Sequence, residues 1–422
     1  MRFSAPLLLL PVFLVVPMSA TLRAQGKLAA SRPRAESSRI PVSVRWNRLV
    51  PVFVEEEATR RRAARVAAAG DAEALKRIAQ NPPPFLFRVY PILSVAQYAA
   101  VSAATDKHSA SATSAAIASA SAVVLTEFFI DSTVRASIAR ELARDVDHAG
   151  VVARSPNALL AGKRLGEEAA RRVLAWVPPF NMIAPFTGTI PTGPGMWTSA
   201  RGVPPIGTAM ATSRAWLLDS ASQFRPAPPP AYGSPAFDAA IEEVRRIART
   251  RTSEQTQIAQ KWDTGDPMGA WNETASAAIL RHGMPEAEAV RVLALLNVGA
   301  SDAAIACFDA KYHYWTIRPS QVDTTLVLAD KVGLPNFPSY PSGHACTAGA
   351  FDAVLGHFFP KERVEFTRIA EEQAMSRLYG GIHYRFDNDG GLALGRIVAA
   401  HDVERERRGQ FNAWRTAVVT KP

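Results

Sequence analysis

The sequence predicts an all-α protein, and three observations carry this prediction. Apolar residues recur at the spacing of a helix face in one segment after another, alanine is abundant in these segments, and no run alternates with the period of two that a half-buried strand needs. The chain has 422 residues, of which 48% are hydrophobic and 20% are charged. That is enough to bury the core of one large domain or of two.

The first element is a short apolar segment at the N-terminus. Residues 1–24 begin with Met and Arg2, continue through an apolar run from Ala5 to Val16, and end in small residues. This pattern predicts a secretory signal peptide, because the apolar run is too short to cross a bilayer. An uncleaved membrane anchor is the alternative. Residues 25–42 form a polar leader, and we expect the mature protein to be periplasmic or secreted.

Residues 43–177 form the N-terminal helical part. Helices are expected over Val54–Ala69, Pro91–Ala104, Ser132–His148 and Asn157–Trp176. Thr113–Ile130 comes closest to a membrane span, but its alanine and serine content and Glu127 favour a buried helix. We therefore expect no membrane span in the mature chain.

Residues 178–233 are rich in proline and glycine, which predicts either a linker between helical bundles or a long functional loop. Residues 234–422 form the C-terminal helical part. Helices are expected there over Phe237–Thr264, Ala270–His282 and Glu286–Arg318. This part also carries three short polar blocks, and these blocks indicate the function.

The first two blocks supply cations and a helix N-terminus. Lys311 and Arg318 are seven residues apart, so on one helix both would project from the same face and could reach one anion. The second block begins with Ser342, a good helix N-cap, followed by Gly343 and His344. An anion at this point would meet the hydroxyl group, the glycine amide and the positive end of the helix dipole.

The third block adds a further cation and a histidine with a carboxylate partner. Arg377 offers a planar fork that suits bidentate contact with an oxyanion. His383 and Asp387 are one helical turn apart, so the carboxylate can hold one ring nitrogen and leave the other facing the anion. Together the three blocks predict a site for a tetrahedral oxyanion.

The pattern Lys-x6-Arg-Pro, Pro-Ser-Gly-His, Ser-Arg-x3-Gly-x-His-x3-Asp resembles the signature shared by vanadium-dependent haloperoxidases and the type 2 phosphatidic-acid phosphatase superfamily. All three blocks match in order, and the match covers the last quarter of the chain. It extends more loosely upstream through Trp262, Trp271-Asn272 and the segment 216–230, which look like soluble bacterial members. The resemblance implies helical bundles of the phosphatidic-acid phosphatase/haloperoxidase type, with the Pro/Gly-rich loop shaping the entrance of the site.

The resemblance also implies a role for each matching residue. The oxygens of the oxyanion would be bound by Lys311, Arg318, Ser342, Gly343 and Arg377. His383 would be the axial ligand of vanadate in a haloperoxidase, or the nucleophile that forms a phosphohistidine in a phosphatase. His344 would be the acid/base, and Asp387 would orient His383.

Three functions stay open at this point. A haloperoxidase would use vanadate, hydrogen peroxide and halide, whereas a phosphatase would use phosphate monoesters and no cofactor. A non-catalytic oxyanion-binding protein would not need both histidines. The chain reads Phe386 before Asp387 and Phe-Pro-Ser-Tyr-Pro from Phe337 to Pro341, which resembles the haloperoxidase version. Phe337 is expected to line the pocket, and a plain core role is the alternative.

The net charge and the distribution of the arginines indicate which classes of binding partner to expect. The net charge of +10 favours anions, but the arginines are scattered without an aromatic-interleaved basic stripe, so we expect no nucleic-acid binding. The sequence is compatible with a homo-oligomer. Cys307 and Cys346 each lie about one turn from a site residue, which leads to the hypothesis that a disulfide joins their helices.

Overall fold

The computed structural model describes residues 40–80, 84–104, 110–152, 156–177, 184, 186–200, 203–412 and 414. In these residues the regular elements are all helices, with no β-strand and one isolated antiparallel bridge, Met196 to Thr316. The all-α prediction is confirmed. The predicted signal peptide, residues 1–24, and all but the end of the predicted leader, residues 25–42, lie outside the described residues.

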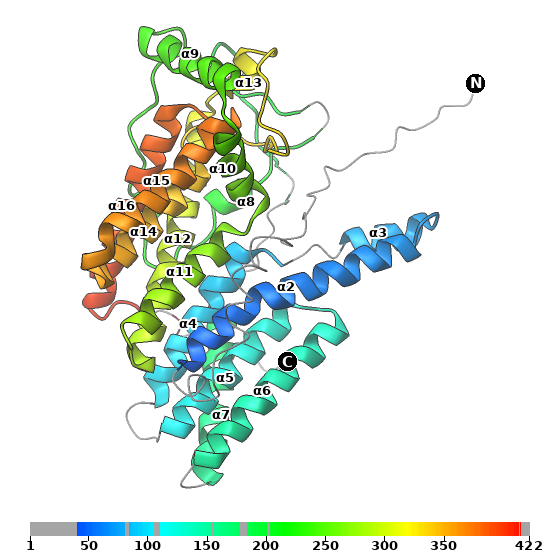
Figure 1. The fold of residues 1–422 in the computed structure, drawn as a ribbon, viewed down its shortest axis with the longest axis vertical. Helices are drawn as coiled ribbons and strands as arrows, with labels where there is room; N and C mark the ends of the chain where they lie inside the picture. Colours follow the sequence, from blue (N-terminus) through cyan, green and yellow to red (C-terminus); the bar gives the residue numbers. More distant parts are fainter. Residues whose placement is uncertain are drawn as a thin grey trace.

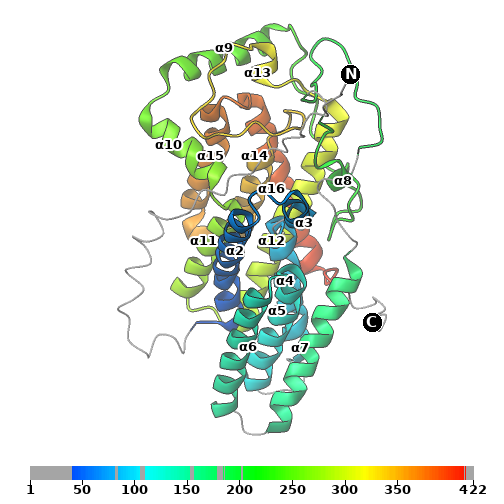
Figure 2. The same cartoon turned by 90° about the vertical axis from the view of Figure 1, so that its right-hand side faces the viewer.

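The helices are α2 (Val42–Ala67), α3 (Ala72–Gln80), α4 (Leu86–Ala104), α5 (Ala110–Phe128), α6 (Ser132–Val152), α7 (Pro156–Trp176), α8 (Thr208–Ala211), α9 (Pro235–Thr250), α10 (Ser253–Thr264), α11 (Pro267–Arg281), α12 (Glu286–Tyr314), α13 (Pro319–Val322), α14 (Gly343–Phe358), the 3-10 turn η2 (Pro360–Glu362), α15 (Arg363–Gly380) and α16 (Arg385–Arg407). They form two groups at opposite ends of the molecule (Figures 1 and 2). Helices α4 to α7 lie at one end, and α9, α10 and α13 cover the other end of a bundle of α12, α14, α15 and α16.

Helix α12 joins the two groups. It is apolar on nearly all sides, and it packs against α4 at one end of the molecule and against α14 and α16 at the other. A helix that is hydrophobic all round has to be buried. One continuous core therefore runs from Val44 to Val403 through α2, α4, α5, α12, α14 and α16.

Helices α14 and α16 approach each other closely because glycines face the contact. A Cβ added at Gly349 would collide with the backbone of Leu392, and one added at Gly395 would collide with the backbone of Cys346. The start of α14 is also tied to α16, since the Ser342 N–H donates to the carbonyl oxygen of Asp387 at 2.9 Å. This crossing brings the second and third polar blocks together.

The Pro/Gly-rich segment is a long irregular loop interrupted by the short helix α8, and its described residues are fastened along α12. Tyr314 donates its hydroxyl to the Pro226 carbonyl at 2.6 Å, Arg225 pairs with Asp309 at 2.8 Å, and the buried Asp302 accepts backbone N–H groups of residues 216–218. The division of the chain at residues 178 and 233 stays a prediction.

Three predicted helices differ clearly from the structure. The helix expected over Val54–Ala69 is α2, which begins twelve residues earlier, at Val42, and ends at Ala67. The helix expected over Phe237–Thr264 is broken, because Thr252 caps a new helix: its hydroxyl accepts the Gln255 N–H, and the Gln255 side chain accepts the Thr252 N–H. The helix expected over Glu286–Arg318 ends at Tyr314, where Trp315 takes a left-handed conformation with φ of 50°.

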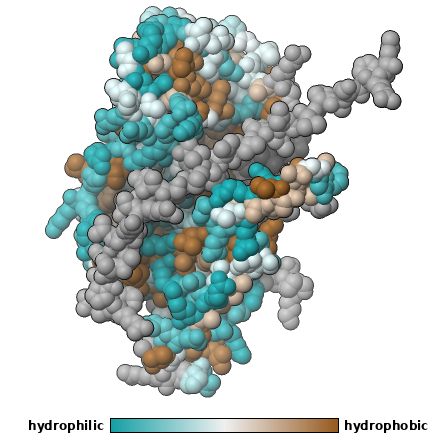
Figure 3. All heavy atoms as spheres, turned by 45° about the vertical axis from the view of Figure 1, so that its right-hand side comes forward, coloured by the Kyte–Doolittle hydropathy of each residue, from teal (hydrophilic) through white to brown (hydrophobic). Residues whose placement is uncertain are grey.

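Among the described residues, two helices are long and apolar enough to cross a membrane, α5 and α12. However, 67% and 89% of their most apolar windows are buried inside the protein, so they are weak candidates for spans. The coloured residues on the face in Figure 3 are largely hydrophilic, with separate hydrophobic spots.

Candidate functional site

Lys311 lies in the last turn of α12 and is completely buried. Its ammonium group donates to the carbonyl oxygens of Pro338 at 2.9 Å and Ser339 at 2.8 Å. Burial lowers the pKa of Lys311 to about 8, because the protein interior disfavours the charged form. The side chain thus fixes the segment that leads into the second polar block.

Arg318 lies near Lys311 but is not part of α12. The prediction that the two side chains project from one helix face is therefore wrong. The chain leaves α12 at Trp315, and Arg318 directly precedes α13. Its guanidinium donates to the carbonyl oxygens of Phe337 at 3.1 Å and Ile382 at 2.8 Å, and one nitrogen lies 3.2 Å from His383 Nε2. Burial lowers the pKa of Arg318 to about 10.

Phe337 packs between these two cations and the core. The ring centroid is 4.9 Å from Lys311 Nζ and 5.1 Å from Arg318 Cζ, distances at which a cation attracts the face of an aromatic ring. Phe308 of α12 contacts Phe337 edge-on. The half-buried Phe337 is therefore a wall of the site and also part of a core cluster.

The second block begins α14 as predicted. Ser342 is buried and precedes the helix, and its hydroxyl faces the Ala345 N–H at 3.5 Å. A Cβ added at Gly343 would meet no atom within 4 Å, so there is open space on the side of this residue where a side chain would stand. His344 is half-buried, and its Nε2 lies 2.9 Å from the Trp262 carbonyl, so Nε2 carries the proton of the neutral ring. Burial, followed by the charge of Arg377, lowers the pKa of His344 well below its usual value.

Arg377 projects from the end of α15 and is 1% exposed. One terminal nitrogen donates to Asp263 of α10 at 2.5 Å. The other two guanidinium nitrogens, Nε and Nη1, are buried and have no hydrogen-bond partner among the described residues. A buried donor without a partner costs about 1–3 kcal/mol, and more when it is charged, so these two N–H groups point to a ligand.

Residues His383 and Asp387 make the predicted contact, although His383 lies in the turn before α16 and not on the helix. The ring nitrogen Nδ1 is 2.8 Å from Asp387 Oδ2. The same oxygen accepts the Ser339 hydroxyl at 2.6 Å and the Tyr384 N–H at 3.1 Å. Nδ1–H therefore points to the carboxylate, and Nε2 is left as the acceptor.

The buried charges set the protonation of this pair. Burial, together with Arg318 and Lys311, lowers the pKa of His383 well below its usual value, so the ring is neutral at pH 7. Burial raises the pKa of Asp387 to about 6, and the hydrogen bond from Ser339 opposes this rise. At neutral pH the carboxylate is thus ionised beside a neutral imidazole whose Nε2 carries a free proton-acceptor lone pair.

The structure brings together every residue that the sequence predicted for the site. Buried cations, a helix N-terminus with open space beside Gly343 and a neutral His383 fit a tetrahedral oxyanion such as vanadate or phosphate. Among the described residues no group of three His, Cys, Asp or Glu side chains could hold a metal cation.

Sequence reasoning missed two residues of the site and proposed one bond that is not formed. Asp263 follows Trp262, and Ser339 lies inside the segment from Phe337 to Pro341, so both stood beside residues already singled out. Cys307 and Cys346 are buried free thiols in the structure, and the disulfide predicted between them is not formed.

Comparisons with known proteins find similarity to one superfamily over part of the chain. A family model of the PAP2 superfamily matches residues 291–404. The lipid A 1-phosphatase of Rhizobium etli is 46% identical over 59 residues, which are 14% of this chain and 25% of that protein. The vanadium-dependent bromoperoxidase of Ascophyllum nodosum is 31% identical over 116 residues, 21% of each chain. The chain thus spans about a quarter of the length of the curated relatives it matches.

Two solved structures share the fold over most of the chain. A bacterial vanadium-dependent iodoperoxidase superposes with a TM-score of 0.63 at 23% identity, covering 84% of this chain and 96% of that one. An apo-type bacterial vanadium-dependent chloroperoxidase superposes with a TM-score of 0.62 at 13% identity, covering 76% and 93%. At these identities the likeness concerns the fold alone.

Proposed function

Because the chain belongs to the superfamily that unites PAP2 phosphatases and vanadium-dependent haloperoxidases, we propose that it is a vanadate-dependent haloperoxidase that oxidises halide with hydrogen peroxide. The observation that carries the proposal is Arg377, whose Nε and Nη1 are buried without partners next to the other cations. The fold shared with haloperoxidases over most of the chain supports it, as does Phe386 beside the site.

Each residue has a defined task in this proposal. Vanadate, when bound, would supply a Lewis-acidic centre that activates hydrogen peroxide for attack by halide. The neutral His383 would hold it through Nε2, since Asp387 keeps the proton on Nδ1. Lys311, Arg318 and Arg377 would neutralise the charge of its oxygens, and Ser342 and the Gly343 amide would add uncharged donors.

His344 would manage the protons of peroxide and water. Its ring is neutral in the free protein, because burial and the charge of Arg377 disfavour the imidazolium. A bound anion reverses this balance, since a nearby negative charge favours the protonated form. His344 would then accept a proton from the incoming peroxide and return it to the leaving water.

The alternative is an acid phosphatase, and the 46% identity to lipid A 1-phosphatases over 59 residues favours it. Here the Nε2 lone pair of His383 would attack phosphorus in line and form a phosphohistidine, and protonated His344 would deliver a proton to the leaving alcohol oxygen. The same cations would neutralise the equatorial oxygens. Export of the protein through residues 1–24 is part of either proposal.

Two assays on one preparation separate these functions. The protein is freed of bound anions and loaded with orthovanadate, and peroxide-dependent halogenation of a phenolic dye is measured with iodide, bromide and chloride. Hydrolysis of para-nitrophenyl phosphate is measured in parallel without vanadate. We expect halogenation that requires vanadate, and no hydrolysis. Hydrolysis that vanadate inhibits, without halogenation, would replace the proposal by the phosphatase alternative.

A matched histidine variant controls for indirect effects. His313 lies two residues from Lys311 but is exposed on another face of α12. His313→Ala should keep the wild-type rate in whichever assay is positive. His344→Ala should lose turnover and still bind vanadate in equilibrium dialysis, because it contributes no ligand to the anion in this proposal.

A further inference from the structure

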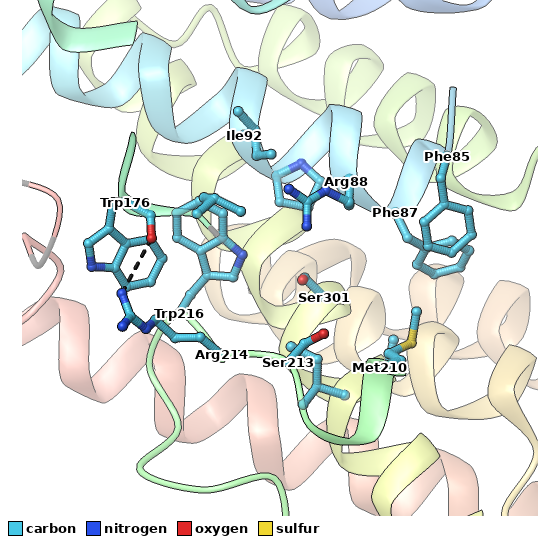
Figure 4. A pocket seen from close by; sticks show the side chains of 14 residues that line it. Phe85, Phe87, Arg88, Ile92, Trp176, Met210, Ser213, Arg214, Trp216 and Ser301 are labelled. Atoms are coloured by element: carbon cyan, nitrogen blue, oxygen red, sulfur yellow. Dashed lines mark hydrogen bonds between the residues drawn. The ribbon is translucent and has the colours of Figure 1, made fainter. Parts of the chain in front are cut away.

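The pocket in Figure 4 is too small for an organic ligand. It lies between α4, α7, α8 and α12, and its internal volume is about 50 Å³, enough for a few water molecules. Arg214 of its lining already donates to the Trp176 carbonyl oxygen at 3.3 Å, the dashed line in Figure 4. A more prominent feature lies on the surface, where α2 extends beyond the other helices.

The end of α2 and the whole of α3 project from the helical body (Figure 1). Residues 62–67 are exposed on every side of α2, and α3, with 9 residues, packs against α2. Isolated helices of fewer than about 12–15 residues are marginal in water, and most helices in proteins are stabilised by packing of an apolar face. This arm, residues 58–80, therefore offers a helix surface that a partner would stabilise.

One face of α2 carries a stripe of exposed residues that begins on the body and continues onto the arm. Arg62 donates to Glu55 at 2.7 Å and to the Thr59 hydroxyl at 2.8 Å, so these side chains share one face of the helix. A spacing of seven residues, close to two helical turns, adds a valine at each end of this face. The stripe consists of Val52, Glu55, Thr59, Arg62 and Val66.

The stripe is complementary to itself in the antiparallel direction. Thr59 is its centre, with Val52 seven residues before it and Val66 seven residues after it, and these valines are 48% and 76% exposed. When a second copy is turned by 180° about Thr59, Val52 of each copy meets Val66 of the other, and Glu55 meets Arg62. A parallel pairing would place like charges together. A two-fold dimer uses one patch of both subunits in this way.

We propose that this face of α2 is a dimer interface, on which a second copy of the chain packs its own α2 in the antiparallel direction about Thr59. The valines supply apolar contact, and the pairs of Glu55 with Arg62 fix the direction, since exposed ion pairs add little to stability. Binding of the second copy does not depend on the proposed function, because the stripe contains no residue of the oxyanion site.

The expected dimer is weak. Stable interfaces bury about 1,200–2,000 Å² in total, and a contact between one pair of helices lies at or below the lower end of this range. We therefore expect a dissociation constant in the micromolar range. The first test is sedimentation equilibrium of the full chain at concentrations from about 1 to 100 μM, where the mean mass should rise from that of a monomer towards that of a dimer.

A matched pair of valine variants tests the stripe. Val66→Glu places a carboxylate against Val52 of the other copy, so the dissociation constant should rise by at least about 10-fold. Val151→Glu is the control, because Val151 is 84% exposed at the end of α6 and lies outside the stripe. It should associate like the wild type. The unfolding temperature of each variant shows whether it is folded.

Disulfide trapping tests the position of the two-fold axis. Thr59→Cys would place the thiols of the two copies next to each other, so mild oxidation with copper-phenanthroline should give a covalent dimer on a non-reducing gel. Ala64→Cys puts a thiol on another side of the exposed helix and should stay monomeric on the gel. Cys307 and Cys346 are buried and should not cross-link.

Three results would overturn the proposal. Wild-type protein that stays monomeric at every concentration has no such interface, and if this monomer sediments with vesicles of anionic lipid, lipid covers the arm instead. Association that Val66→Glu leaves unchanged would mean that the copies meet elsewhere. Equal cross-linking of Thr59→Cys and Ala64→Cys would exclude an antiparallel pairing centred on Thr59.

Discussion

The two sides of the oxyanion site differ in how their cations are bound. Lys311 and Arg318 donate to the carbonyl oxygens of residues 337–339 and 382, so protein groups already use most of their hydrogen bonds. On the other side Arg377 makes one bond, to Asp263, and keeps two buried nitrogens without partners among the described residues. The first side holds the loops in place, and the second holds donors ready for a ligand.

This difference shows how a buried cluster of cations can persist in a folded chain. Carbonyl oxygens and Asp387 offset the charge of Lys311 and Arg318, and Asp263 offsets that of Arg377. Among these three cations, the buried nitrogens without a hydrogen-bond partner are Nε and Nη1 of Arg377. Binding of the anion would then complete hydrogen bonds that folding left open, with little rearrangement.

The largest effect is expected at His383, which both sides face. His383→Ala removes the group whose Nε2 would contact the anion directly, so turnover should fall by at least about 10³-fold in either assay. The measurement is kcat/KM for halogenation and for phosphate ester hydrolysis. Wild-type rates in the folded variant would refute the assignment of the site.

The next largest effects are expected from two substitutions that keep the positive charge, one on each side of the site. They compare the roles of the two sides. Arg377→Lys loses the planar fork, so vanadate affinity should fall by about 10–100-fold while stability changes little. Arg318→Lys loses bonds to the Phe337 and Ile382 carbonyls, so the free energy of unfolding should fall by about 1–3 kcal/mol. Equilibrium dialysis and denaturant unfolding measure the two quantities. Equal losses of stability in both variants would erase the distinction between the sides.

A pH titration probes the first side further. The pKa of Lys311 is lowered to about 8, so this cation is lost from the free protein as the pH rises above 8, and anion affinity should fall by up to about 10-fold per pH unit. Sulfate is the suitable probe, because its charge stays constant over this range. Stability should change in the opposite direction: above pH 8 the unfolded chain binds the extra proton, so the free energy of unfolding rises towards pH 10.5.

Lys311→Met supplies the control for this titration. The variant should bind sulfate more weakly below pH 8, and its affinity should lack the decline that begins near pH 8. If the decline persists unchanged in this variant, another group is responsible for it.

How far the sequence could predict the site depends on whether a residue's role is local. The N-cap Ser342 and the neighbours of His383 were predictable, because short-range spacing determines them. Asp263 was not, since its contact with Arg377 joins α10 to α15 and leaves no periodic trace in the sequence. Ser339 reads as a residue of a proline-rich turn until the fold places it against Asp387.

The same distinction between local and long-range contacts explains which parts of the fold could be predicted from the sequence. Helical periodicity predicted the all-α class and most helices, because each helix carries its own apolar stripe. The end of α12 was not predictable from that pattern. Trp315 leaves the helix where its carbonyl oxygen accepts the Trp197 N–H at 2.7 Å, a contact with a loop more than one hundred residues away. Tertiary pairing thus set the position of Arg318, which the sequence had placed on the helix.

The smallest effect is expected at Ser339, which acts on the site only through Asp387. Its hydroxyl donates to Asp387 Oδ2 at 2.6 Å and lowers the pKa of that carboxyl, which burial has raised to about 6. Asp387 has to be ionised to accept the hydrogen bond from His383 Nδ1–H, so activity should be lost as the pH falls through this pKa. Ser339→Ala removes the opposing bond, and the acidic limb of kcat/KM should move upward by about one pH unit.

At pH 8 the same variant should lose only a few-fold in kcat/KM, because the carboxyl is ionised there with or without the serine. Ser121→Ala is the matched control: Ser121 is equally buried, but it bonds to Ile117 and Gln97 in the core of α4 and α5. It should leave the pH profile unchanged. An equal loss at every pH in Ser339→Ala would mean that the hydroxyl only supports packing, and that the protonation of Asp387 does not depend on it.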